Sequence, residues 1–425
     1  MKPQRGFVAL LMMVLVAVGV FGAMAAWVAS EPPLSKQAIN RVVLGQAKEA
    51  LLAYVVETAL SGKNTRLPCP NITGDGKADV DPIPGGTAKP CGLTGNTQLG
   101  LLPWNALSLP PLRDAYGECL WYAVDGQFKN APSSELTPGV NADTDGRITI
   151  KDEAGQVLAD KVVAVVFARS AKMDSQAHGA SADGAPPCAT TPSGYAAQDA
   201  PIYLGSGNAT PATGTVTSAN LFNATQLAPD KASLTHQLIW ITADEFAAVA
   251  MRANAEPLAT ALKAAVATSV GTNGRYPFAA ATPGGTCRHG LYRGFLPASC
   301  KYPDAVVGPL SFGLDASSNL VKDRWHELAF YAVAPGCAFD APGCVSDATL
   351  IPSKGAVKGA VLVRGKKLQG QDCGAGTANV ATQSLTCLEG SNNLAFDTTK
   401  AGWLSRAVAE PDPALPSNDI LKALP

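Results

Sequence analysis

The stretch "NADTDGRITIKD" (residues 141–152) places oxygen-bearing side chains at the spacing of a calcium-binding loop. The residues at positions 1, 3, 5 and 12 of such a loop are Asn141, Asp143, Asp145 and Asp152. Calcium prefers oxygen ligands, so these four residues are candidate metal ligands and calcium is the candidate cofactor. The strand-like alternation after the loop supports a second interpretation, a β-hairpin whose turn uses the same Asp and Gly residues.

Other groups of reactive side chains are weaker. A second Gly-rich loop, "NITGDGKADVD", offers further oxygen ligands or a solvated acidic turn, through Asn71, Asp75, Asp79 and Asp81. The histidines have no zinc-binding spacing, and they are His178, His236, His289 and His326. The chain has neither a G-x-S-x-G elbow nor a phosphate-binding loop. The sequence therefore predicts a protein that is not an enzyme.

The 10 cysteines all follow the first apolar run, and most lie in loop-like sequence without metal spacing. They predict disulfides in an oxidising compartment. Because short loops close at low entropic cost, neighbouring cysteines are the candidate pairs: Cys69 with Cys91, Cys287 with Cys300, Cys337 with Cys344, and Cys373 with Cys387. Two cysteines remain, Cys188 and Cys119, and Cys119 is a candidate free thiol in a buried strand.

Length and composition limit the class of protein. The 425 residues exceed one small core and favour two folded units. The formal net charge is -1 and only 16% of residues are charged, without a strong basic patch. A nucleic-acid partner is therefore not expected.

The N-terminal segment has the properties of a membrane span. Residues 7–29 contain no charged side chain, and as a helix they would extend about 34 Å, enough to cross a hydrocarbon core of about 30 Å. Lys2 and Arg5 precede the segment, which predicts a cytoplasmic N-terminus. The predicted location is single-pass in the inner membrane, with the bulk of the chain periplasmic or in a surface filament. A secretory signal cleaved after Ala25 is the alternative.

The next segment, residues 34–61, predicts an amphipathic helix. Its apolar stripe has helical spacing and comprises Ile39, Val42, Val43, Ala47, Ala50, Leu51, Tyr54 and Val55. Lys36, Arg41, Lys48 and Glu49 lie on the other faces. The helix should therefore bury its stripe against a folded domain.

The motif "QRGF", followed directly by the long apolar segment, resembles the N-terminus of type IV prepilins and type II secretion pseudopilins. The resemblance covers about the first sixty residues. It implies cleavage by a prepilin peptidase after Gly6 and N-methylation of Phe7, with other pilin or pseudopilin subunits and the inner membrane as partners. Most pilins carry a glutamate at the fifth mature position, where this chain has Leu11. That departure favours a minor subunit that initiates a filament or lies at its tip.

The rest of the chain contains an internal repeat of about two hundred residues. Within a one-residue slip, Asp114, Tyr116, Glu118, Trp121 and Tyr122 match Asp323, Trp325, Glu327, Phe330 and Tyr331. Each copy has a helix and short β-prone segments, and "KVVAVVFA" reads as a central strand apolar on both faces. The helix of the second copy is expected to pack only within its own domain, with Asp244 and Glu245 in its first turn.

The predicted fold class is α+β, with a long N-terminal transmembrane and amphipathic helix followed by two tandem pilin-like units of helix plus antiparallel sheet. The expected organisation is a leader (1–6), a transmembrane helix (7–29), a first unit (34–169), a loop (170–235), a second unit (236–410) and a tail (411–425). The predicted function is a minor pilin-like structural subunit of a type IV pilus or type II secretion pseudopilus. The alternative is an anchored or secreted binding module, adhesin-like, with Trp104, Trp121 and Trp325 in clefts.

Overall fold

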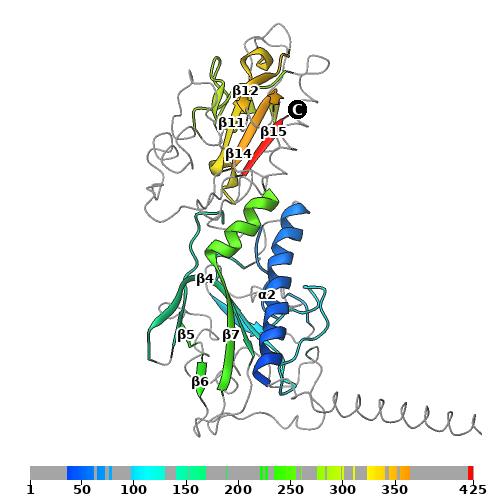
Figure 1. Ribbon diagram of the computed structural model, residues 1–425, viewed down its shortest axis with the longest axis vertical. Coiled ribbons are helices and arrows are strands. Elements are labelled where there is room, and N and C mark those ends of the chain that lie inside the picture. The colour runs from blue at the N-terminus through cyan, green and yellow to red at the C-terminus, as the bar shows by residue number, and fades with distance from the viewer. Residues whose placement is uncertain are drawn as a thin grey trace, which may run out of the picture.

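A computed structural model gives the fold (Figure 1). It describes residues 36–61, 65–71, 76–78, 97–129, 140–168, 188, 221–227, 234–254, 260, 275–300, 310–311, 323–339, 344–351, 355–363 and 420–424, less 153, 224, 283–284 and 298. Gly6, Phe7 and the expected 7–29 span lie outside these residues.

The first unit is built on a seven-stranded, mainly antiparallel sheet whose core order is β1-β2-β4-β3-β5. Strand β7 pairs with β4 on the edge opposite β2, and β6 pairs with β7. The bounds are β1 Gln98–Leu101, β2 Trp121–Val124, β3 Ile148–Lys151, β4 Val157–Ala168, β5 Leu221–Asn223, β6 Thr225–Leu227 and β7 Leu234–Thr242. Helix α2 (Lys36–Leu60) packs against β4 and β7.

The second unit follows a helix at residues 243–254 and has a four-stranded antiparallel sheet, in the order β15-β14-β11-β8. Two short hairpins, β9 with β10 and β12 with β13, accompany it. The bounds are β8 Arg293–Phe295, β9 Ser299–Cys300, β10 Leu310–Ser311, β11 Ala329–Val333, β12 Asp347–Ile351, β13 Gly355–Val357, β14 Gly359–Val363 and β15 Ile420–Leu424, with 3-10 turns η5 Trp325–Leu328 and η6 Pro335–Cys337.

Strand β4 forms the centre of the first unit because its second half is apolar on both faces. Residues 162–168 are all buried. Val163, Ala164 and Val166 join the cluster that also contains α2, whereas Val165 and Phe167 lie in a second cluster on the other face. The predicted central strand is confirmed.

Helix α2 buries a stripe at helical spacing, but not the whole predicted one. Its buried apolar residues include Leu44, Ala47, Leu51 and Val55, whereas Val42 is 59% exposed. The buried position one turn before Leu44 is polar: Asn40 Oδ1 accepts a hydrogen bond of 2.7 Å from the Ala115 amide. The buried stripe is therefore rotated around the helix, relative to the predicted one, so that it includes Asn40. The side chain of Asn40 is buried because it supplies the acceptor for the Ala115 amide.

The membrane-spanning element of the predicted fold class is contradicted. Of the helices in the described part of the chain, none combines the length and apolar character needed to cross a bilayer, and α2 itself carries Lys36, Arg41, Lys48 and Glu49. The described chain is instead largely antiparallel sheet. The prediction of a fold organised by a long transmembrane helix, and of a single-pass inner-membrane location, is wrong on this finding.

The sequence repeat corresponds to two sheets with the same connectivity. Strands β1, β2, β4 and β7 pair in the same order and direction as β8, β11, β14 and β15. In each unit the tyrosine of the central aromatic strand donates to a proline carbonyl 54 residues earlier, Tyr122 to Pro68 at 3.1 Å and Tyr331 to Pro277 at 2.9 Å. The two residues of each of the five matched pairs are 209 positions apart, so the expected one-residue slip does not occur.

The two tyrosine hydroxyls allow a matched prediction. Both phenols are fully buried, and burial raises the pKa of each well above its ordinary value. Tyr122→Phe and Tyr331→Phe should each lower the free energy of unfolding by about 0.5–1.5 kcal/mol, since each leaves a proline carbonyl without its donor. Urea unfolding of the two variants measures this. A loss confined to one variant would show that the two hydrogen bonds are not equivalent.

Two segments expected to lie outside the units supply strands. The expected loop, 170–235, contributes β5, β6 and the first residues of β7. The expected tail, 411–425, contributes β15, which pairs with β14 over five residues. β7 and β15 occupy the same place in the two sheets. Each sheet is therefore completed by a strand that is far along the chain from the strand with which it pairs.

Candidate functional site

The predicted calcium ligands take part in turns and ion pairs. Asp152 accepts a 2.8 Å hydrogen bond from the Gln156 amide in the β3–β4 hairpin turn, and Asp145 pairs with Lys161 at 3.0 Å. Asn141 Oδ1 accepts from the Asp143 amide at 3.0 Å. Within the described residues, no three His, Cys, Asp or Glu side chains gather closely enough to hold a metal ion. Asp152 lies in the turn of a β-hairpin, as the second interpretation expects, whereas Asp145 and Gly146 precede β3 and Gly146 does not have a positive φ.

The second candidate loop is only partly described. Asn71 is buried and pairs with Leu101 through two backbone hydrogen bonds of 2.9 and 3.0 Å. Asp75, Asp79 and Asp81 lie outside the described residues. Asn71 therefore has a structural place at the end of β1.

A buried carboxylate that the sequence does not single out holds the 140–147 loop in place. Asp125 is 0% exposed at its side chain and pairs with Arg147, whose Nη2 lies 2.6 Å from Oδ1. It also accepts from the Arg147 and Gln127 amides at 2.6 and 2.8 Å. Arg147 Nε is a fourth donor, 3.0 Å from Oδ1, and the four donors compensate the cost of burying this charge. Only its position directly after the β2 strand could have indicated its role.

The contact between the two units has a buried ion pair at its centre. Arg66 Nη2 lies 2.8 Å from Asp323 Oδ1, and the two side chains are 3% and 1% exposed. Asp323 also accepts from the Thr65 amide at 3.3 Å and the Val140 amide at 3.5 Å. A second guanidinium nitrogen of Arg66, Nη1, donates to the Gln127 carbonyl. Two segments of the first unit, residues 65–66 and Val140, therefore meet one carboxylate of the second unit, and we call these contacts the junction.

Two opposing effects act on the pKa of Asp323 at the junction. Burial raises the pKa of Asp323 above its ordinary value, while the charge and hydrogen bond of Arg66 and the two backbone amides act in the lowering direction. Desolvation is the larger effect, as expected for a carboxylate removed from water. The ion pair thus gives the junction its geometry more than its stability.

The helix at 243–254 extends the junction and does not pack only within its own unit, contrary to expectation. Its start is a capping box, in which the Glu245 amide donates to Thr242 Oγ1 and the Thr242 amide donates to Glu245 Oε2, at 3.2 and 3.0 Å. The other carboxylate oxygen of Glu245 lies 2.5 Å from Lys48 Nζ on α2. Phe246 meets the ring of Phe128 edge-on at 4.9 Å.

The far end of this helix meets the junction itself. Asn254 is 3% exposed, and its amide nitrogen donates to Thr65 Oγ1 at 3.2 Å and to the Ala250 carbonyl at 2.7 Å. Asn141 adds a contact on another side, donating to the Arg324 carbonyl at 3.1 Å. The Arg66–Asp323, Asn254–Thr65 and Asn141–Arg324 contacts thus join the two units and fix one relative position of two like units.

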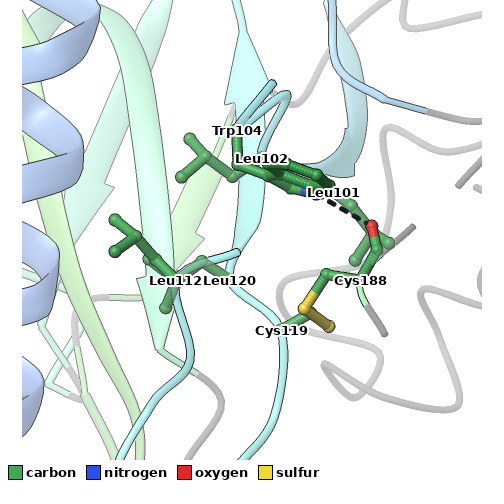
Figure 2. A pocket seen from close by; sticks show the side chains of 7 residues that line it. All are labelled: Leu101, Leu102, Trp104, Leu112, Cys119, Leu120 and Cys188. Atoms are coloured by element: carbon green, nitrogen blue, oxygen red, sulfur yellow. Dashed lines mark hydrogen bonds between the residues drawn. A yellow bond between two sulfur atoms is a disulfide. The ribbon is translucent and has the colours of Figure 1, made fainter. Parts of the chain in front are cut away.

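A small apolar pocket lies beside β1 and β2, lined by Leu101, Leu102, Trp104, Leu112, Cys119, Leu120 and Cys188 (Figure 2). Trp104 Nε1 donates to the Cys188 carbonyl at 3.0 Å. The lining carries no charged side chain, so the pocket could make apolar contacts but has no charged group for acid–base catalysis or ion binding. Trp121 and Trp325, placed in clefts by the binding-module alternative, are each 1% exposed in the core.

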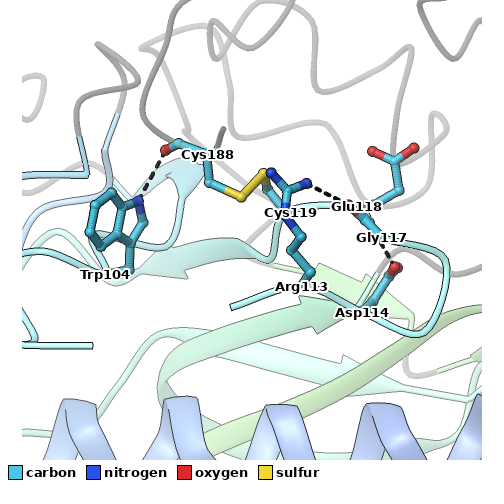
Figure 3. The surroundings of a disulfide bond; sticks show 7 residues. All are labelled: Trp104, Arg113, Asp114, Gly117, Glu118, Cys119 and Cys188. Carbon is cyan, nitrogen blue, oxygen red and sulfur yellow. Dashed lines mark hydrogen bonds between the residues drawn. A yellow bond between two sulfur atoms is a disulfide. The ribbon is translucent and has the colours of Figure 1, made fainter. Parts of the chain in front are cut away.

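Cys119 and Cys188, the two cysteines without a neighbouring partner, form a disulfide (Figure 3). The interpretation of Cys119 as a free thiol is wrong, because the chain brings a cysteine 69 positions away to it. On the other side of Cys119, Arg113 donates to the Gly117 carbonyl and Asp114 accepts from the Glu118 amide (Figure 3). The disulfide therefore ties residue 188 to a well-defined turn.

Of the remaining cysteines, those whose side chains the structure describes are also disulfide-bonded. Cys337 and Cys344 form a disulfide across seven positions, as their short separation predicts. Cys69 and Cys287 are also disulfide-bonded. Cys91, Cys373 and Cys387 lie outside the described residues, and the side chain of Cys300 is not described. Each assigned disulfide has one cysteine close to an aromatic strand, Cys119 just before β2 and Cys337 just after β11.

The junction is therefore the site where the described contacts are most concentrated. Its contacts position one folded unit on the other. Comparison with known proteins adds no relative: no protein-family model, curated protein or solved structure matches this chain.

Proposed function

We propose that this chain is a pilin-like structural subunit, of the minor pseudopilin kind, that initiates a filament of a type IV pilus or a type II secretion pseudopilus or lies at the tip of that filament. The observation that carries the proposal is the sequence "QRGF" ahead of an uncharged segment, with Leu11 in place of the usual glutamate. Its partners are other pilin or pseudopilin subunits and a prepilin peptidase.

Three structural features support this role. Helix α2 lies along one face of an antiparallel sheet, a helix-and-sheet arrangement suited to a filament subunit. The second unit adds bulk that suits a subunit at an end of a filament. The buried carboxylates of Asp125 and Asp323 are each engaged by an arginine, which suits a structural rather than a catalytic role.

Processing at Gly6 tests the proposal. Mass spectrometry of the mature protein should find Phe7 at the N-terminus with one added methyl group. Gly6→Leu should leave the leader attached, because a bulky side chain replaces the glycine at the cleavage point, and should abolish filament incorporation. Gly19→Leu, inside the apolar segment, is the matched control and should be processed normally.

The competing secretory-signal interpretation gives a different mass. A mature protein that starts at Ala26, or a Gly6→Leu variant that is processed and assembled like the wild type, contradicts the pilin-like role.

A further inference from the structure

The two copies of the repeated acidic motif have different conformations. The first copy is "DAYGE", residues 114–118, and its carboxylate closes on its own turn: Asp114 Oδ1 accepts from the Tyr116 and Glu118 amides at 2.8 and 2.9 Å. We call this arrangement the closed turn. The second copy, "DRWHE", starts at Asp323 and does not close in this way.

The carboxylate of the second copy binds the first unit instead. Asp323 accepts from the Arg66 guanidinium at 2.8 Å and from the Thr65 amide at 3.3 Å. Within its own turn, the Glu327 amide donates to the Arg324 carbonyl at 3.3 Å rather than to the carboxylate. The group that closes the turn in the first copy therefore holds the two units together in the second.

The two forms of the turn place a positive φ at different positions. In the second copy this residue is Arg324, with φ 59° and ψ 22°, and Asn141 of the first unit donates to its carbonyl at 3.1 Å. Its counterpart Ala115 does not have a positive φ; in the closed turn the positive φ, 82°, is at Gly117. The counterpart of Gly117 is His326, which does not have a positive φ. Closure of the second copy in the same form would therefore move the positive φ from Arg324 to His326.

The form adopted by the second copy carries energetic costs. A left-handed conformation is unfavourable for a residue with a Cβ atom, such as Arg324, whereas His326 is of a type that tolerates positive φ better than most. Trp325 is 1% exposed, and its Nε1 has no hydrogen-bond partner in the described part of the chain, which is costly for a buried donor. In the closed turn its counterpart Tyr116 is 39% exposed, with Lys36 Nζ 3.9 Å from the ring centroid. These costs oppose the contacts of the junction.

We propose that residues 323–327 form a two-state turn. In the docked state, which the structure shows, Asp323 binds the first unit. In the open state the same carboxylate accepts from amides of its own turn, as Asp114 does, and the second unit separates from the first. Because the carboxylate has donors in both states, opening does not leave it unpaired, and a strained residue at the contact suits a two-state element. The chain is therefore hinged at the junction, whether or not it is processed at Gly6.

Hydrogen exchange of the full-length protein measures the opening. Separation of the units removes Asp323 as the acceptor of the Thr65 amide. This amide should therefore exchange at least about tenfold faster than the Val361 amide, which lies in β14 between β11 and β15. Its exchange should also depend less steeply on urea, because separation of two folded units exposes less surface than unfolding does.

Two glycine substitutions should shift the turn in opposite directions. Arg324→Gly relieves the docked state, so exchange at Thr65 should be about fivefold slower than in Arg324→Ala. His326→Gly relieves the open state, so exchange at Thr65 should be about fivefold faster than in His326→Ala. Each alanine variant is the matched control, because it removes the same side chain beyond Cβ and keeps the atom that disfavours a positive φ. A fivefold change corresponds to about 1 kcal/mol.

Three results would overturn the two-state turn. The first is exchange at Thr65 that is as slow, or as steeply dependent on urea, as exchange at Val361, since the units would then separate only by unfolding. The second is a pair of glycine variants that shift exchange in the same direction. The third is a glycine variant without effect, since Arg324 or His326 would then keep one conformation when the units separate.

Discussion

Asp323→Ala should lower the free energy of unfolding by about 3–5 kcal/mol, the cost of leaving one buried charge without its partner. Arg66 would keep its 3% exposed guanidinium in the junction, and the Thr65 and Val140 amides would lose their acceptor. Asp114→Ala is the matched control, since its Oδ1 serves two amides of its own turn. That change should cost about 1–3 kcal/mol, the penalty for unsatisfied buried donors.

Replacing both Arg66 and Asp323 tests whether their ion pair stabilises the junction or only sets its geometry. Arg66→Met combined with Asp323→Leu should regain most of the loss in urea unfolding, because apolar packing can substitute for a buried ion pair. A double variant as unstable as the sum of the single variants would mean that the pair itself stabilises the junction, contrary to the expectation.

The pH dependence of the same residue has a definite sign. Since the folded pKa of Asp323 is raised above its ordinary value of 3.8, its contribution to stability is fully present below that value and is lost as the pH rises through the folded pKa. The stability of the wild type minus that of Asp323→Asn should therefore fall as the pH rises above 3.8. A difference that grows with pH would show that Arg66 outweighs desolvation.

Removal of the Cys119–Cys188 disulfide by alanine at both positions should lower the free energy of unfolding by about 4 kcal/mol. The bond closes a loop of 69 positions, and the entropy that it removes from the unfolded chain grows with the logarithm of loop length. The matched change at Cys337 and Cys344 opens a loop of only seven positions and should cost about 2 kcal/mol on the same relation. Thermal unfolding of the two double variants compares them directly.

Equal losses in the two variants would contradict the loop-length argument. A smaller loss at Cys119 and Cys188 would indicate that the unfolded chain already holds these segments together. Trp104→Phe adds a further measurement, since it removes the hydrogen bond to the Cys188 carbonyl while the disulfide remains.

Sequence patterns predicted the helix and the strand that depend only on neighbouring residues. The apolar run in β4 and the helical spacing in α2 are properties of neighbouring residues, and the repeat was visible because both copies kept their aromatic strand. Val42 was misplaced because spacing alone cannot show that Asn40 is needed to cap the Ala115 amide. β15 was missed because five strand residues follow a Pro-rich stretch that reads as a tail.

Long-range partnerships could not be predicted. Arg66 and Asp323 are 257 positions apart, and each occurs in a repeated motif whose other copy has a different partner. The acidic spacing of residues 141–152 has two physical explanations, a metal loop and a hairpin, and only the positions of Lys161 and Gln156 show what two of these carboxylates contact.

The late arrival of β7 has a consequence for the chain as it leaves the ribosome. Until residue 234 has been made, the second half of β4 can pair with β2 but not with β7, so an apolar strand keeps one open edge through the synthesis of the whole 170–233 segment. Open apolar edges pair readily with other chains. We therefore expect the nascent first unit, rather than the finished protein, to be the form of this chain that most requires a chaperone.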